Sequence, residues 1–100
     1  MKITKKAENN TTILFIEGWL DTQSSPELHA EIDSLEEINN LVLDFEKLEY
    51  ISSSGLREVV SAYKKATNAG GKFSIINVSE EVMDVFRLTN FDKKLEISAK

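Results

Sequence analysis

The chain has 100 residues, a length that suits one hydrophobic core, so we expect a single domain over residues 1–100. Its formal net charge of −5, from 12 basic and 17 acidic residues, opposes binding to the phosphate backbone of nucleic acid. Cysteine is absent, which excludes disulfides, a thiolate nucleophile and cysteine-ligated metal. No apolar run reaches membrane-spanning length or resembles a signal peptide, so we predict a cytoplasmic protein without membrane insertion.

The first quarter of the chain predicts a β-hairpin. Residues 2–6 have the mixed character of an edge strand, and residues 11–17 are rich in β-branched and aromatic side chains. The asparagines within residues 7–10 suit the turn between them, because asparagine tolerates a left-handed backbone. Gly18 then ends the second strand or introduces a bulge, since glycine weakens a strand interior.

The first helix is predicted to begin at Ser25 and Pro26. Serine suits the N-cap, and proline suits the first helical position. Leu28, Ile32 and Leu35 form an apolar stripe at helical spacing. We therefore expect an amphipathic helix with one buried face.

The centre of the chain predicts a buried strand and then the longest helix. Residues 41–45 are nearly all apolar, as in a strand covered on both faces. Residues 46–50 are interpreted as a short connection. Beyond them, the apolar positions adopt a helical period. These positions are Leu56, Val59, Val60 and Tyr63.

The last third predicts a strand, a helix and a short final strand. Residues 68–71 end in two glycines and terminate the central helix. Residues 73–78 have the composition of a strand, and Ser79 is the expected cap of a third helix. Residues 90–93 are predicted to form a loop, and residues 95–97 a short strand.

The resulting order is β-β-α-β-α-β-α-(β). Helices that alternate with strands require a mostly parallel sheet with crossover connections, and the initial hairpin adds an antiparallel edge. We therefore expect an α/β fold in which a small mixed sheet of four to five strands is flanked by three to four helices.

Three serines and a glycine separate the central strand from the central helix. A serine hydroxyl accepts a hydrogen bond from a free N–H group at a helix N-terminus, so one serine of Ser52, Ser53 and Ser54 suffices for a cap. The others place hydroxyls at the positive end of the helix, where an added phosphate would be stabilised. The run is therefore either a cap alone or a regulatory site.

No enzyme site is evident. The single histidine, His29, lies beside the apolar stripe of the first helix and is interpreted as a surface residue. A serine hydrolase would need an oriented base and a nucleophile elbow, and neither pattern surrounds any serine. Gly70, Gly71 and Lys72 follow a helix and lack phosphate-loop spacing, which disfavours nucleotide binding. We expect a non-enzymatic protein without metal or cofactor, and keep a small hydrolase as an alternative.

Several sequence motifs follow one another in a recognisable order. They are Gly18–Asp21, Leu43–Phe45, Ile51–Arg57, Gly70–Lys72 followed by Phe73–Ile76, and Val85–Thr89 followed by Phe91–Asp92. The most specific is the serine-glycine-leucine block between strand and helix. Together these motifs resemble the STAS domain, and more narrowly the bacterial anti-sigma factor antagonists, and the resemblance covers essentially the whole chain.

This resemblance implies a function and a set of site residues. In the family, an anti-sigma factor with a GHKL-type kinase fold phosphorylates the serine that carries over to Ser53, and a PP2C-type phosphatase reverses this step. The unphosphorylated form binds the anti-sigma factor and releases the sigma factor. The implied partner-binding surface consists of Asp21, Ser52, Ser53, Ser54, Gly55 and Leu56.

One position departs from the family motif, because Ser52 stands where the family has aspartate. Serine and aspartate both cap helices, so the helix start should be preserved. The lost carboxylate changes the charge beside the phosphorylation site, which keeps Ser52 and Ser54 as alternative acceptors. It also motivates a second hypothesis, a STAS adaptor or scaffold without phosphorylation in a signalling or transport complex.

Overall fold

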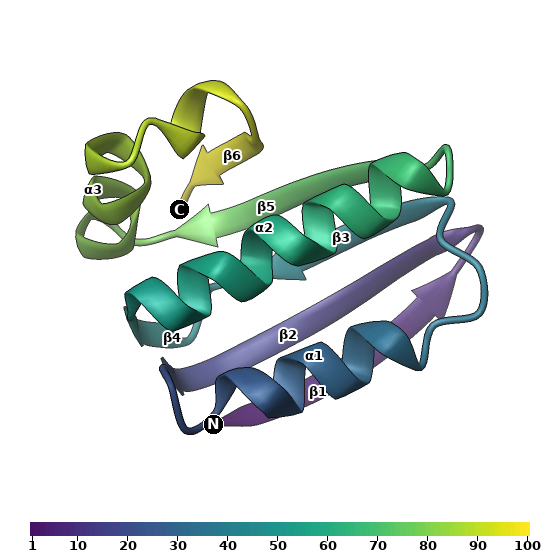
Figure 1. Cartoon of the computed structure of the whole chain (residues 1–100), viewed down its shortest axis with the longest axis horizontal. Coiled ribbons are helices and arrows are strands. Elements are labelled where there is room, and N and C mark those ends of the chain that lie inside the picture. The colour runs from purple at the N-terminus through teal and green to yellow at the C-terminus, as the bar shows by residue number, and fades with distance from the viewer.

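A six-stranded mixed sheet forms the framework of the protein in the computed structural model, which describes residues 1–100 (Figure 1). Three α-helices and one 3-10 helix connect the strands. The strands are β1 (Lys2–Glu8), β2 (Thr11–Leu20), β3 (Asn40–Asp44), β4 (Leu48–Ile51), β5 (Lys72–Val78) and β6 (Glu96–Ala99). The helices are α1 (Ser25–Asp33), α2 (Ser53–Asn68), α3 (Glu80–Leu88) and η1 (Phe91–Lys93).

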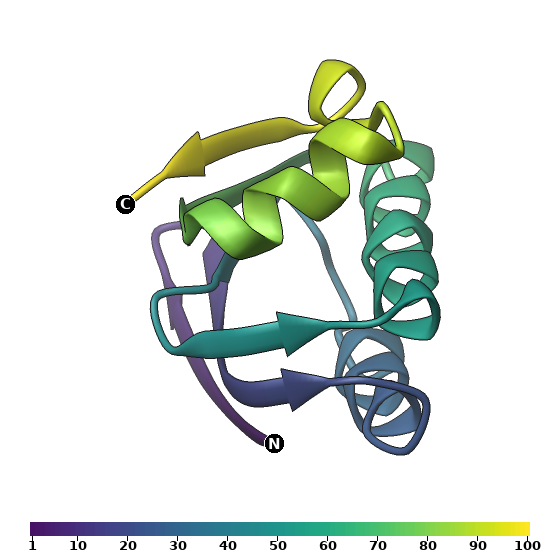
Figure 2. The same ribbon diagram turned by 90° about the vertical axis from the view of Figure 1, so that its left-hand side faces the viewer.

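The sheet topology agrees with the predicted mixed α/β fold. The strand order is β1-β2-β3-β5-β6, in which β1 is antiparallel to β2 and the remaining pairs are parallel. Helices α1 and α2 lie side by side on one face of the sheet (Figure 2), and α3 packs against β4. The predicted edge hairpin is confirmed, although β1 extends to Glu8 and only Asn9 and Asn10 form the turn.

Strand β4 was not predicted, because residues 46–50 were interpreted as a connection. It pairs in parallel with the end of β2. Its four residues are buried, exposed, exposed and buried in turn, so they lack the alternation that identifies a strand from sequence. Gly18 is the first residue of β2 in this pairing. It has a φ of +93° and lies at the expected bulge. The part of β2 before the bulge pairs with β3, and the part from Gly18 onward pairs with β4.

One core joins the sheet to the helices. It contains Leu14 and Ile16 of β2 and Leu43 of β3, all less than 2% exposed. The inner face of α2 is formed by Leu56, Val59, Ala62 and Ala66, and it includes two alanines that the prediction did not single out. Small side chains at these positions let the helix lie close to the sheet. Val60 and Tyr63, predicted to belong to the core stripe, are only half-buried at its flank.

Helix boundaries follow the capping serines. Ser52 and Ser79 cap α2 and α3 as predicted, each hydroxyl accepting from a backbone N–H. Helix α1 begins one residue earlier than predicted: Ser24 is the N-cap, whereas Ser25 is buried and donates its hydroxyl to the carbonyl of Asp21. The predicted C-terminal loop includes η1, and the final strand is displaced toward the C-terminus relative to its prediction.

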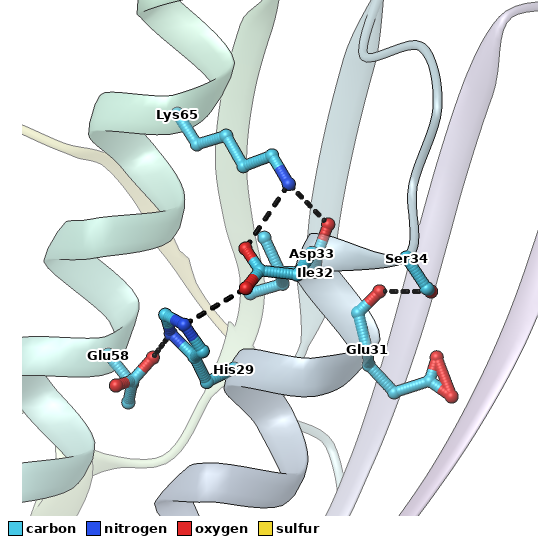
Figure 3. Close-up of polar contacts among 7 residues, drawn as sticks. All are labelled: His29, Glu31, Ile32, Asp33, Ser34, Glu58 and Lys65. Carbon is cyan, nitrogen blue, oxygen red and sulfur yellow. Dashed lines mark hydrogen bonds and ion pairs between the residues drawn. The ribbon is translucent and has the colours of Figure 1, made fainter.

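A polar cluster ties α1 to α2 on the outer surface (Figure 3). His29 contacts Asp33 through Nε2 at 3.0 Å and Glu58 through Nδ1 at 3.0 Å. Lys65 donates to the Ile32 carbonyl at 2.9 Å. The side chain of His29 is half exposed, which agrees with its interpretation as a surface residue. Because such exposed pairs contribute about 0.2–1 kcal/mol each, the cluster orients the two helices more than it stabilises the fold.

None of the helices combines the length and the apolar character that crossing a bilayer requires.

Two leucine-to-alanine substitutions should separate the core from the surface. Leu28 on α1 is fully buried, so Leu28→Ala should lower the free energy of unfolding by about 2–5 kcal/mol through lost burial and a residual cavity. Leu88 on α3 is 84% exposed, so Leu88→Ala should change it by less than about 0.5 kcal/mol. Urea denaturation measures both. Equal losses would contradict the assignment of the core.

Candidate functional site

The candidate site is the serine turn, which we define as Ser52–Gly55. It comprises the N-cap and the first residues of α2, directly after β4, and lies at the end of the molecule where β2 also ends (Figure 1). The N–H of Ser52 donates to the carbonyl of Leu20 at 2.9 Å, so the turn is attached to the end of β2. The hydroxyl of Ser52 accepts from the N–H of Gly55 at 3.2 Å, which confirms the predicted N-cap.

The three hydroxyls of the serine turn have different surroundings. That of Ser52 caps the helix. That of Ser54 shares a hydrogen bond of 3.0 Å with Thr22 and accepts from the Arg57 guanidinium at 3.3 Å. Ser53 is exposed, and its hydroxyl has no hydrogen-bond partner. Ser53 is therefore the serine whose hydroxyl is both accessible and uncommitted.

Gly55 and Leu56 lie inside the fold rather than on its surface. A Cβ on Gly55 would lie 2.5 Å from the Leu20 carbonyl oxygen and 2.8 Å from the Leu20 side chain. The family resemblance places Gly55 on the partner-binding surface. In the structure, the close approach at Gly55 is to β2 of the same chain. Leu56 is 6% exposed, so it anchors α2 to the core and leaves only its edge accessible.

Asp21 organises the neighbouring loop between β2 and α1. Its carboxylate accepts from the N–H of Ser24 and the N–H of Gln23, both at 3.1 Å, and from the Ser24 hydroxyl at 3.0 Å. The backbone hydrogen bond from Ser24 is the main cause of a lowered pKa of Asp21. Thr22, which follows it, contacts Ser54. The structure thus brings Asp21 and the serine turn into adjacent loops, and Asp21 acts there by holding its own loop.

Two large aromatic side chains stand beside these loops. Trp19 of β2 and Tyr50 of β4 face each other in the strand register, with ring centroids 5.1 Å apart. Trp19 is 57% exposed and Tyr50 is 46% exposed. Sequence reasoning missed this pair, and also Thr22, because both depend on the pairing of β2 with β4. Each aromatic residue directly precedes the last residue of a strand that leads into one of the two loops.

The start of α2 favours an anion at the serine turn. The first turn of α2 contains no acidic residue, and Arg57 lies one turn further on. The free N–H groups of a helix N-terminus carry a partial positive charge that favours an anion. The turn therefore favours an anion locally, although the chain has a net charge of −5 and the Asp21 carboxylate lies in the adjacent loop.

The serine turn has neither the hydrogen bonds of a catalytic site nor the ligand cluster of a metal site. No histidine or carboxylate is hydrogen-bonded to a hydroxyl of the serine turn, since His29 is engaged with Asp33 and Glu58. No group of three or more histidine or acidic side chains is placed to hold a metal ion. What the turn offers a partner is one free hydroxyl, helix N–H groups and exposed aromatic surface.

The combination of this sheet, these helices and a serine turn at the start of α2 corresponds to a known class of domain. The family model of the STAS domain matches residues 2–100, so the chain belongs to the STAS domain family. The chain is also 28% identical over 101 residues to the anti-sigma-B factor antagonist of Bacillus subtilis (strain 168), a match that covers 100% of this chain and 93% of that protein. The resemblance found in the sequence is confirmed.

Solved structures show the same fold. An anti-sigma factor antagonist from Mycobacterium paratuberculosis has a TM-score of 0.89 and 20% identity, covering 99% of this chain and 86% of that one. The Bacillus cell fate determinant SpoIIAA in its phosphorylated form has a TM-score of 0.77 and 17% identity, covering 99% of this chain and 93% of that one.

Adding a side chain at Gly55 should disrupt the serine turn. Gly55→Ala should lower the free energy of unfolding by about 1–3 kcal/mol, because the new Cβ overlaps the Leu20 carbonyl. Ser53→Ala, at the exposed neighbour, is the control and should change stability by less than about 0.5 kcal/mol. Chemical denaturation measures both variants. A neutral Gly55→Ala would mean that the helix start does not rest on β2 as described.

The lowered pKa of Asp21 predicts a pH dependence. A carboxyl whose pKa is lower in the folded state stabilises the fold above its unfolded value of 3.8, and this contribution is lost as the pH falls through the folded pKa. Asp21→Asn should therefore be less stable than wild type at neutral pH, and the difference should disappear in strong acid. Denaturation at several pH values tests this. Glu36→Gln, which removes an exposed carboxylate without hydrogen bonds, should show no such pattern.

Proposed function

We propose that this protein is a cytoplasmic anti-sigma factor antagonist. In the unphosphorylated state it binds a kinase-type anti-sigma factor and thereby releases a sigma factor. Membership of the STAS domain family and the similarity to the anti-sigma-B factor antagonist of Bacillus subtilis support this proposal. The protein acts by binding and has no catalytic activity of its own in this scheme.

The proposal depends mainly on one observation, the exposed and uncommitted hydroxyl of Ser53 at the start of α2. This accessibility supports Ser53 as the phosphate acceptor. The hydroxyls of Ser52 and Ser54 are the less suitable alternatives, because the first caps the helix and the second binds Thr22. The fold likeness to the Bacillus cell fate determinant SpoIIAA, described in a phosphorylated form, is compatible with this choice.

A phosphate on Ser53 would act on the surface and leave the fold intact. It would carry about −1.5 to −2 charges at neutral pH and would lie at the positive end of α2. The first helical turn has no acid to repel it. The modified protein should therefore stay folded, and the change would be limited to what a partner meets at the serine turn.

Binding in the unphosphorylated state would use the surface around the turn. Trp19 and Tyr50 present rigid apolar area of the kind that dominates binding energy in protein interfaces. A phosphate on Ser53, within an interface that also includes these rings, would have to lose its hydration without a matching cation from the partner. That loss costs several kcal/mol, and every 1.4 kcal/mol weakens binding about tenfold. Phosphorylation therefore prevents binding by charge, and no large conformational change is needed.

The implied partners are an anti-sigma factor that is a GHKL-type serine kinase and a PP2C-type phosphatase that removes the phosphate. One observation favours a second candidate. Ser52 replaces the family aspartate beside the acceptor, so a kinase that recognises this carboxylate would not recognise the turn. In that case the protein would be a STAS adaptor without the switch, binding through the same surface.

The test is the intact mass of the protein from its native host, before and after phosphatase treatment, with the modified residue located by fragmentation. One removable phosphate on Ser53 is expected. A phosphate on Ser52 or Ser54 would keep the switch and correct the acceptor. No phosphate in any growth phase would contradict the switch and favour the adaptor.

Binding to the anti-sigma factor provides a second readout. Ser53→Asp should weaken the complex by about 2 kcal/mol or more, roughly 30-fold, since it places a carboxylate in the interface. Ser98→Asp makes the same change at an exposed serine of β6 and should leave affinity unchanged. If Ser53→Asp bound as tightly as wild type, the proposed interface would be wrong. Calorimetry measures these affinities.

A further inference from the structure

A groove runs along the outer side of α2 toward η1. It consists of two adjoining hollows, of about 340 and 230 Å³, which share Val60, Lys64 and Phe91. We call it the α2–η1 groove. Its lining residues are Leu56, Arg57, Val60, Ser61, Tyr63, Lys64, Phe91, Lys94 and Leu95.

The floor of the groove is apolar. Val60, Tyr63 and Phe91 are half-buried, and Leu56 and Leu95 are almost wholly buried beneath them. Val60 and Tyr63 belong to the helical apolar pattern of α2, yet the sheet does not cover them completely. The accessible part of this pattern from position 56 to position 64 extends for about two helical turns, or roughly 12 Å.

The rim of the groove is basic. Arg57, Lys64 and Lys94 are exposed, and no acidic residue lines the groove. None of the three forms an ion pair, although the chain carries 17 acidic and 12 basic residues. A cluster of uncommitted cations on an acidic protein is complementary to an acidic partner segment.

The groove is continuous with the serine turn. Leu56 follows the turn directly, and Arg57 both lines the groove and donates to Ser54. A partner that contacts Ser53 could therefore extend along α2 without leaving its interface.

We propose that the α2–η1 groove binds an acidic amphipathic helix of the anti-sigma factor. Its apolar face would cover Val60 and Phe91, and its carboxylates would lie against Arg57, Lys64 and Lys94. This is the arrangement in which an amphipathic helix occupies a groove through apolar residues at helical spacing. The choice of the anti-sigma factor as the partner rests on the proposed function. The preference of the groove for an acidic amphipathic helix rests only on its lining residues.

A synthetic helix tests the groove directly. The probe is a capped 18-residue peptide with leucine on one helical face and glutamate on the other, titrated into the isotope-labelled wild-type protein and followed by amide chemical shifts. We expect the shifts to cluster at Val60, Lys64, Phe91 and Lys94. Lys64→Glu combined with Lys94→Glu should weaken binding at least tenfold.

A matched variant controls for general charge effects. Lys2→Glu combined with Lys5→Glu makes the same charge change on β1, where both lysines are exposed and unpaired, and should alter affinity less than twofold. The groove proposal is overturned if this control weakens binding equally, if the shifts lie elsewhere, or if the peptide does not bind at about 1 mM. It is also overturned if a peptide with lysine in place of glutamate binds as well.

The same variants separate this proposal from the proposed function. The expected result is that the Lys64/Lys94 variant and Ser53→Asp both weaken binding of the anti-sigma factor, the Lys variant at least tenfold. If only Ser53→Asp weakens binding, the groove proposal fails and the switch is kept. If only the Lys64/Lys94 variant weakens it, the switch fails and the groove is kept.

Discussion

The parallel pairing of β2 with β4 is the constraint on which the candidate site depends. The bulge at Gly18 turns the last residues of β2 away from β3 and toward β4, so that the two strands end together. The loop that starts at Asp21 and the turn that starts at Ser52 then leave the same edge of the sheet. Gly55 completes the arrangement, because only a residue without a side chain lets α2 start against Leu20.

The surface around that edge differs from the ion-paired parts of the molecule. Lys65 is engaged by Asp33, and Arg87 by Glu80. Around the start of α2, by contrast, Arg57 forms no ion pair, and Trp19 and Tyr50 are exposed near the ends of the two strands that lead to this edge. Under the proposed function, such a surface would distinguish binding partners by charge, so one added phosphate would change its affinity.

The sequence predicted the elements that depend on local chemistry. Capping serines, apolar periods and the alternation of strands with helices are local signals, and they predicted α2, α3 and the mixed sheet. The sequence did not predict strand β4, because the two exposed residues in its middle interrupt the alternation of buried and exposed positions that identifies a strand. The contact of Gly55 with Leu20 could not be predicted for a related reason. A glycine that accommodates a segment of the same chain and one that accommodates a partner look identical in sequence, and only the position of Leu20 distinguishes them.

The hydrogen bond from Ser52 to Leu20 spans more than thirty residues of chain, and so does the contact of Ser54 with Thr22. The serine turn is thus a tertiary epitope, whose shape exists only when β2 and β4 are already paired. A short peptide that contains Ser52–Leu56 lacks the wall formed by Leu20 and cannot reproduce it. A kinase or binding partner that recognises the shape of the turn would therefore bind only folded chains. Nascent or denatured chains would not compete with folded ones for that partner.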